Sequence, residues 1–346
     1  MRKLVLTVLL LTAIALPANA LDLTAPQVPS VAEEFMPDSA DNLAEGIQQV
    51  IKEAAGHLRP DLREAYRICL GIIGTVMVIS LLRTGQEDRG RTVDLAGAVV
   101  VSTIFLSGAD ALFDLGADTV IQISEYGKLL LPVMTAALAA QGGITSSAGL
   151  YTVTAMFDAI LAGLISNVLM PFLYLFLALG VAHSAVGEDM LKRMRDSVKW
   201  LMTWLLKTIL YVFNGFISIT GVVSGPTDAA ALKAAKLTIS GVVPVVGGIL
   251  SDASEAVLVS VGTVKNTVGM YGLFAVLAIW IGPFLRIGAH YLVLRFTGAV
   301  CAVFADKRIT DLIQDFATVM GFLLAMTGAV CLMLLISTVC FMRGVM

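Results

Sequence analysis

The chain has 346 residues, of which 58% are hydrophobic and 14% are charged, and its formal net charge at pH 7 is −3. With a mean hydropathy of +0.88, this composition excludes an ordinary soluble domain and predicts an all-α polytopic membrane protein. The slightly acidic balance, without a basic tail or an aromatic-rich basic patch, gives no reason to expect nucleic acid as a partner.

The first twenty residues have the pattern of a secretory signal peptide. Two basic residues precede the apolar run Leu4–Leu16, and Ala18-Asn19-Ala20 provides an A-x-A processing signal. The apolar run is too short for a comfortable spanning helix but has the usual length of a signal sequence. We therefore expect residues 1–20 to be removed and the new N-terminus to lie outside the cytoplasm.

Residues 21–64 are polar and mostly acidic, and they include a helix-compatible run from Asp41 to Glu64. A segment of this size is too small to have a hydrophobic core of its own. We predict an extracytoplasmic segment that forms either a linker with an amphipathic helix or a contact for a partner.

Residues 65–346 form the predicted helical membrane domain. Depending on whether its short proline-containing runs cross fully, the domain has seven to nine spans after the signal peptide. Its apolar runs are Tyr66–Leu82, Val93–Leu115, Leu129–Gln141, Leu150–Val168, Pro171–Val186, Trp200–Val223, Val242–Leu250, Thr267–Ile281, Pro283–Phe304 and the terminal helix Phe316–Cys340.

The loops between these runs predict the orientation. Basic residues gather in Arg83–Arg91, Lys192–Lys199 and Asp306–Arg308, which the positive-inside rule places in the cytoplasm. The amphipathic stretches Asp118–Lys128 and Asp228–Thr238 are then expected at the outer face, as connections between helices. The C-terminus is expected to lie outside.

One of the short runs predicts a broken helix. Between Ser240 and Ser251 an uncharged stretch contains Pro244 and the pair Gly247 and Gly248, although a spanning helix needs about 20 apolar residues. Proline removes a backbone donor, so at membrane depth such a stretch must be buried in protein or face a watery cavity. We predict a broken or re-entrant helix that lines a path, and an ordinary kinked helix is the alternative.

The prolines also suggest an internal duplication. Pro132 and Pro171 are separated by the same interval as Pro244 and Pro283, and Phe-Leu follows the second proline of each pair. This pattern predicts two parallel repeat units, at about residues 93–199 and 200–311, each with a broken helix. The candidate path residues are Pro132, Pro171, Pro244, Gly247, Gly248 and Pro283.

Charged residues inside apolar runs are the other candidates, because a charge at the bilayer centre costs about 2.5 to 3.5 kcal/mol on insertion scales. Asp110, Asp114 and Asp118 share one helix face, which is either a solvated helix end or a functional acidic face. Asp158 lies near the middle of its run and is either structurally paired or a proton or ion site. The candidate intramembrane charges are Asp110, Asp114, Asp158, Lys207 and Arg286, with Arg295 as a further possible cation partner of Asp158.

Catalytic and metal-binding patterns give no support to an enzyme. The sequence contains no P-loop, HExxH or nucleophile-elbow motif, and its four cysteines and three histidines lack metal-ligand spacing. We therefore expect no enzyme activity, no cofactor and no metal. Any energy for transport must come from another subunit.

The strings AKLTISGVVPVVGGILSDASEAVL, LLPVMTAALAAQGG and ISNVLMPFLYLFLALG resemble the stage III sporulation protein AE family of endospore-forming bacteria. The resemblance implies a multi-pass protein of the mother-cell membrane around the forespore, in a channel complex similar to specialised secretion systems. It further implies a permease-like or scaffold role in late forespore gene expression. The implied partners are other membrane proteins of the complex, a separate ATPase and the forespore stage II sporulation protein Q.

The residues themselves leave two other functions open. A self-contained secondary transporter of a small solute would use Asp158, or the face of Asp110 and Asp114, as its coupling site. The third possibility is an intramembrane enzyme, and the only residues that support it are scattered Asp and His residues.

Overall fold

The computed structural model describes residues 25–37, 43–84, 90–242 and 247–343. All regular secondary structure in these ranges is helical, as predicted from the composition. The helices are α2 (Ser30–Glu33), α3 (Leu43–Gly56), α4 (Leu58–Thr84), α5 (Gly90–Ala140), α6 (Ile144–Leu164), the π-helical turn η2 (Ile165–Leu169), α7 (Met170–Val186), α8 (Asp189–Val242), α9 (Gly247–Cys301) and α10 (Lys307–Arg343).

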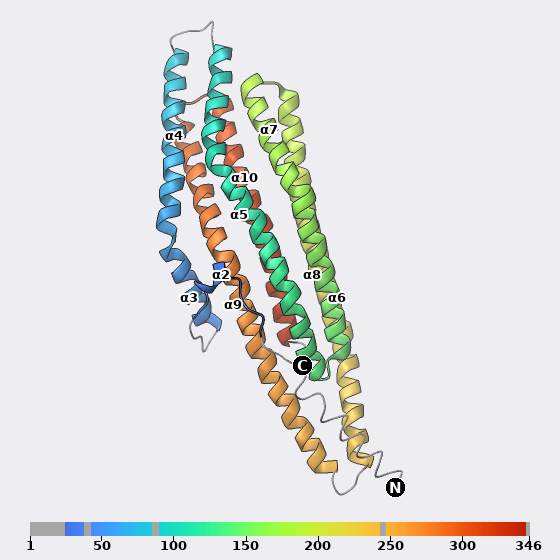
Figure 1. The fold of residues 1–346 in the computed structure, drawn as a ribbon. Helices are drawn as coiled ribbons and strands as arrows, with labels where there is room; N and C mark the ends of the chain where they lie inside the picture. Colours follow the sequence, from blue (N-terminus) through green and yellow to red (C-terminus); the bar gives the residue numbers. More distant parts are fainter. Residues whose placement is uncertain (1–24, 38–42, 85–89, 243–246, 344–346) are drawn as a thin grey trace.

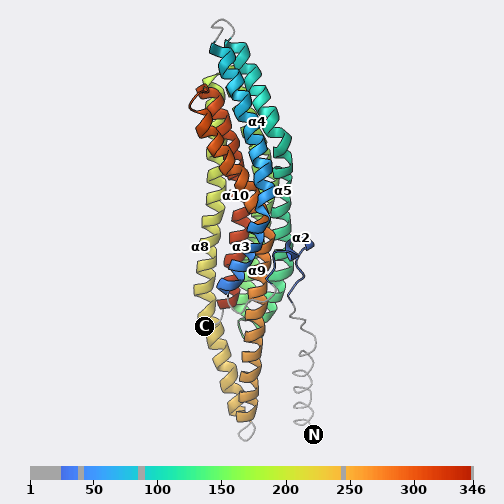
Figure 2. The same ribbon diagram turned by 90° about the vertical axis from the view of Figure 1, so that its left-hand side faces the viewer.

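The long helices form one elongated bundle around α10 (Figure 1). α5, α6, α7, α8 and α9 all pack on α10, while α4 lies outside against α5 and α9. The view in Figure 2 shows the same bundle from the side, with α2 and α3 next to α9. α8 and α9 continue past the other helices at the end of the bundle where α10 finishes (Figure 1).

α10 is the central helix because apolar residues occupy almost its whole circumference. Phe316, Val330, Leu334 and Phe341 are all 0% exposed. The ring of Phe316 stacks on Phe105 of α5, with a centroid distance of 4.0 Å. A helix that is hydrophobic on nearly all sides is stable only when other helices surround it, as they do here.

Six helical stretches of the described ranges are long and apolar enough to cross a membrane, fewer than the predicted seven to nine. Within these ranges, runs that were expected to be separate belong to one helix, and the total of seven to nine spans stays a prediction. α5, for example, includes the expected outer connection Asp118–Lys128 and the run after it. The six stretches are Leu58–Arg83, Thr92–Ala140, Ile144–Val186, Asp189–Ile219, Lys265–Cys301 and Lys307–Arg343.

The predicted break at Pro132 is wrong, since Pro132 lies inside the continuous helix α5. Its side chain is exposed, while Leu130, Leu131 and Met134 are buried and hold the helix against its neighbours. A proline removes the hydrogen bond to the carbonyl four residues earlier, which here belongs to the exposed Lys128. On this outer face water or a headgroup can satisfy that carbonyl, so the helix continues.

The interruption instead occurs before Pro171, where five residues, Ile165–Leu169, form a π-helical turn between α6 and α7. Pro171 cannot donate a backbone hydrogen bond to the preceding turn, and an irregular turn accommodates this loss. The side chain of Asn167 donates to the carbonyl of Gly163 at 3.0 Å and satisfies one of the backbone groups there. The two apolar runs therefore form one long rod with a local irregularity.

The other candidate path residues lie on or near α9. Pro283 is inside this helix, and Gly247 and Gly248 are its first two residues. Pro244 lies outside the described residues, so the predicted break at this position stays a prediction. The order of the elements fits the predicted parallel duplication, because α5 with α6–α7 and α8 with α9 each begin and end at the same end of the bundle (Figure 1). The duplication itself also stays a prediction.

The N-terminal segment packs on α9. In α3, Val50 and Ala54 contact Ile281, as expected for an amphipathic helix whose apolar face needs cover. Phe35 lies against Gly282, where a Cβ atom would approach its ring to 3.2 Å. The segment therefore contributes to the bundle.

Candidate functional site: buried polar groups of the bundle

Asp158 of α6 is a carboxylate in the apolar interior of the bundle. Its relative exposure is 4%, and the hydroxyl of Ser124 on α5 donates a hydrogen bond to its Oδ2 atom at 2.6 Å. The other carboxylate oxygen, Oδ1, is buried and has no hydrogen-bond partner among the described side chains. Such an orphaned acceptor usually costs about 1 to 3 kcal/mol, and more when it is charged.

A pair of hydroxyl groups lies one helical turn away from Asp158. Thr154, four residues earlier on the same face of α6, donates to the hydroxyl of Ser337 on α10 at 2.9 Å. Both residues are 0% exposed. Helices α5, α6 and α10 thus contribute oxygen atoms to one buried region, which we call the hydroxyl–carboxylate cluster (Ser124, Thr154, Asp158 and Ser337).

The helical period of α6 places this cluster. Its buried residues include Leu150, Thr154, Phe157, Asp158 and Leu161, which recur at intervals of three and four and therefore form one stripe. Asp158 and Thr154 point into the bundle together with these apolar neighbours. Their burial follows from the position in the stripe.

The cations expected to pair with Asp158 lie elsewhere. Lys207 is exposed on α8, and Arg295 lies over the ring of Tyr291 at 5.6 Å. Arg286 forms ion pairs across to α4, with Asp61 at 3.5 Å and Glu64 at 3.2 Å. The expected ion pair of Asp158 is therefore not formed within the described ranges, because α9 presents Arg286 to α4 and not to α6.

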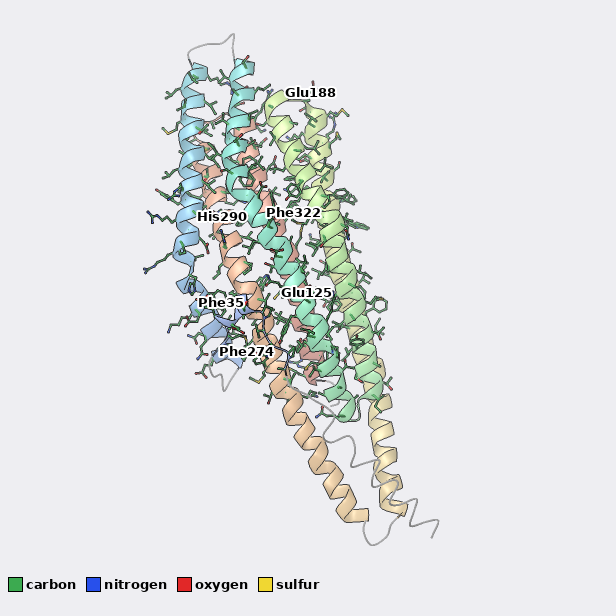
Figure 3. The ribbon with its side chains drawn as sticks, in the orientation of Figure 1. Phe35, Glu125, Glu188, Phe274, His290 and Phe322 are labelled. Carbon is green, nitrogen blue, oxygen red and sulfur yellow. The ribbon has the colours of Figure 1, made fainter. Side chains whose placement is uncertain are left out.

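Asp110, Asp114 and Asp118 line the exposed face of α5, as their spacing predicted. This acidic face continues to Glu125, which is exposed and is labelled in Figure 3. Asp110 and Asp114 lie close enough to Tyr174 of α7 to interact with it electrostatically. The acidic face belongs to the surface of the bundle and is separate from the hydroxyl–carboxylate cluster.

Sequence reasoning missed a buried ion pair between α8 and α10. Nη1 of Arg195 donates to Oδ2 of Asp315 at 2.7 Å, and only 9% and 11% of the two side chains are exposed. Asp196 also accepts from Arg195, at 2.9 Å. Gly180 of α7 leaves room for this pair, since a Cβ atom there would lie 2.8 Å from the Asp315 carboxylate.

The signal for Arg195 was present but easily overlooked. The residue belongs to the basic run that was assigned to the cytoplasm, yet it shares a helical stripe with the buried Met202, Leu206 and Phe213. Asp315 precedes the predicted start of the terminal helix by one residue, while α10 begins at Lys307. The pairing itself depends on the arrangement of three helices and is not readable from one sequence.

A second ion-pair group joins the helix ends at the top of Figure 1. Arg83 contacts Asp94 at 3.4 Å and Asp306 at 3.0 Å. Partial burial opposes ionisation of Asp306, but the hydrogen bond and charge of Arg83, with help from Lys307 and Arg308, outweigh it and lower the pKa of Asp306. This group holds α4, α5 and the α9–α10 turn together.

The described residues contain no group of three or more His, Cys, Asp and Glu side chains placed to hold a metal ion. The four cysteines are free, and three of them are buried. Cys69 instead shares a hydrogen bond with Thr297 at 2.6 Å, which links α4 to α9.

Comparison with known proteins gives one family. The family model described as Stage III sporulation protein AE matches residues 32–344. A protein of Bacillus subtilis (strain 168) named Stage III sporulation protein AE is 21% identical over 239 residues, which cover 69% of this chain and 60% of that protein. The chain thus spans less than two thirds of that relative's length. No solved structure matches.

Proposed function

Because this chain belongs to the stage III sporulation protein AE family, we propose that it is an integral membrane subunit of a sporulation-specific channel complex. The complex links the mother cell and the forespore across their envelopes and is similar to secretion systems. In it, this chain has a permease-like or scaffold role that late forespore gene expression requires. The observation that carries the proposal is the family match over a chain whose described residues include six helical stretches long and apolar enough to cross a membrane.

The arrangement of charges supports an orientation in the mother-cell membrane. Arg83 is in the last turn of α4, Arg195 is near the start of α8, and Lys307 is the first residue of α10. These helix ends lie toward one end of the bundle (Figure 1). The positive-inside rule then assigns this end to the mother-cell cytoplasm. The mature N-terminus and the C-terminus lie on the opposite, extracytoplasmic side.

Other proteins supply what this chain lacks. The sequence contains no nucleotide-binding motif, so a separate ATPase provides energy on the cytoplasmic side. On the extracytoplasmic side, other membrane proteins of the complex and stage II sporulation protein Q of the forespore are the proposed partners. The exposed apolar side chains of α8, among them Trp200, Tyr211 and Ile219, are available to lipid or to such membrane partners.

Deletion and complementation in the native host test the proposal. Without the gene, we expect heat-resistant spores to fall by several orders of magnitude and a late forespore reporter to remain silent, while engulfment proceeds. The intact gene under its own promoter restores both. Normal spore numbers without the gene, or a loss of mother-cell reporters alone, would contradict the proposed role.

A self-contained secondary transporter is the second candidate, and the buried Asp158 carboxylate favours it. Two variants separate the candidates. If Gly248→Leu abolishes spore formation and Asp158→Asn preserves it, the start of α9 matters more than a titrating group, as expected for a channel subunit. The reverse result favours the transporter.

A further inference from the structure

In the hydroxyl–carboxylate cluster, the Asp158 carboxyl group is either ionised without a neighbouring cation or protonated without an acceptor for its proton. Asp158 receives one hydrogen bond, from Ser124, and its Oδ1 atom has no partner among the described side chains. Lys128, one turn beyond Ser124 on α5, acts on Asp158 only from a distance and is itself exposed. An ionised carboxylate in a membrane-spanning stretch therefore needs another positive group.

The groups around Asp158 have the chemistry of a cation site. Ser124, Thr154 and Ser337 present hydroxyl oxygens, and all three are at least 96% buried. Oxygen ligands select hard cations, while nitrogen and sulfur ligands would select transition metals. A divalent ion usually requires several carboxylates, and this cluster has one, so its charge matches a monovalent ion.

From this arrangement we propose that Asp158 binds a monovalent cation of the size of sodium, with hydroxyl oxygens of Ser124, Thr154 and Ser337 as further ligands. The hydroxyl oxygen of Ser124 directs a lone pair toward the ion, and the hydroxyl oxygens of Thr154 and Ser337 do so as well. Since the ligands come from α5, α6 and α10, the ion ties the central helix to two of the helices around it. The proposal does not depend on the role of the complex in sporulation.

Thermal unfolding of the full-length protein in detergent tests this site. At equal ionic strength, saturating NaCl should raise the Tm by about 5 °C over choline chloride, because a ligand that binds only the folded state stabilises it. Asp158→Asn should remove this difference. Asp114→Asn, which removes a carboxylate from the exposed face of α5, is the matched control and should keep it.

Two further measurements keep the proposal testable if Asp158→Asn fails to fold. Ser337→Ala removes one ligand and should raise the NaCl concentration at half-maximal stabilisation about tenfold. Equilibrium binding of radioactive sodium should give about one site per wild-type chain. The proposal is overturned if the Tm is equal in sodium and choline, if Asp158→Asn keeps the sodium effect, or if the Tm responds to pH alone.

Discussion

At the residue scale, Arg195 and Asp315 show how the bundle accommodates charge. Each is nearly buried, and the two satisfy one another across α8 and α10. A buried pair adds little stability over apolar residues of the same volume, whereas the loss of one partner leaves an isolated buried charge. The pair therefore specifies how α8 lies on α10 more than it stabilises the fold.

This view predicts unequal effects of two substitutions around the same guanidinium. Asp315→Ala should destabilise the protein by about 3 to 5 kcal/mol, because the buried Arg195 then keeps only Asp196, which is largely exposed, as a partner. Asp196→Ala removes a partner that is 55% exposed and should cost less than about 1 kcal/mol. Denaturation in detergent, followed by circular dichroism, measures both.

Replacement of the whole pair is the companion experiment. Arg195→Met combined with Asp315→Leu should recover most of the stability that Asp315→Ala loses, since neither substitution leaves a buried charge. A double variant as unstable as the single one would mean that the pair stabilises the contact of α8 with α10 directly.

Individual residues also show what one sequence can predict. Asp158 was identifiable, because a carboxylate in the middle of an apolar run is costly wherever the helix lies. Its partner Ser124 was not, because serine is common in membrane helices and the contact joins residues 34 positions apart. The predicted ion pair between Asp158 and a basic residue was wrong for a similar reason. Which side chains meet depends on how each helix is rotated about its axis in the bundle.

At the element scale, α5 is much longer than a bilayer is thick. Its helical stretch Thr92–Ala140 has 49 residues and extends about 74 Å at 1.5 Å per residue, against a hydrocarbon core of about 30 Å. The sequence predicts several separate segments in place of this helix, because Asp110, Asp114 and Asp118 interrupt its apolar run. All three point outward, so they limit the lipid-covered part of the helix without ending it.

Cysteine labelling tests where lipid ends on α5. A cysteine that replaces Asp114 should react with a membrane-impermeant maleimide added outside intact cells, because the acidic face requires water. A cysteine that replaces Val100, which is 46% exposed and lies 14 residues earlier in the chain, should be protected by lipid. Equal protection of both positions would mean that protein or lipid covers the acidic face.

Pro132 gives a second prediction for the same helix. Because it lies inside a continuous helix, Pro132→Ala should stabilise the protein by up to about 3 kcal/mol and preserve sporulation. Pro132→Gly, as a control, should stabilise less, since glycine weakens helices. A loss of spores in Pro132→Ala with an unchanged Tm would show that the proline has a functional role after all.

At the scale of the whole molecule, the basic helix ends lie together, although they are far apart in the sequence. The positive-inside rule predicted a common side for them, and the up-and-down order of α4 to α10 brings them to one end of the bundle. The number of spans is harder to predict from the sequence, because it depends on which polar stretches are loops and which are exposed faces of helices.

Reporter fusions test the orientation. Alkaline phosphatase fused after Arg343 should be active, and green fluorescent protein at the same position should be dark, because α10 runs away from the basic end. Both reporters inserted at Glu188, in the turn between α7 and α8 (Figure 3), should give the opposite result. The same pattern at both positions would refute the arrangement.

The central place of α10 has a consequence for how the protein is made. This helix leaves the ribosome after α5 to α9, yet all of them pack on it. Before residue 307 is translated, the faces of α5 to α9 that pack on α10 have no partner in the membrane. Thr154 also lacks its hydrogen-bond acceptor, the hydroxyl of Ser337. We therefore expect that a chain that stops before α10 is recognised by membrane proteases and degraded.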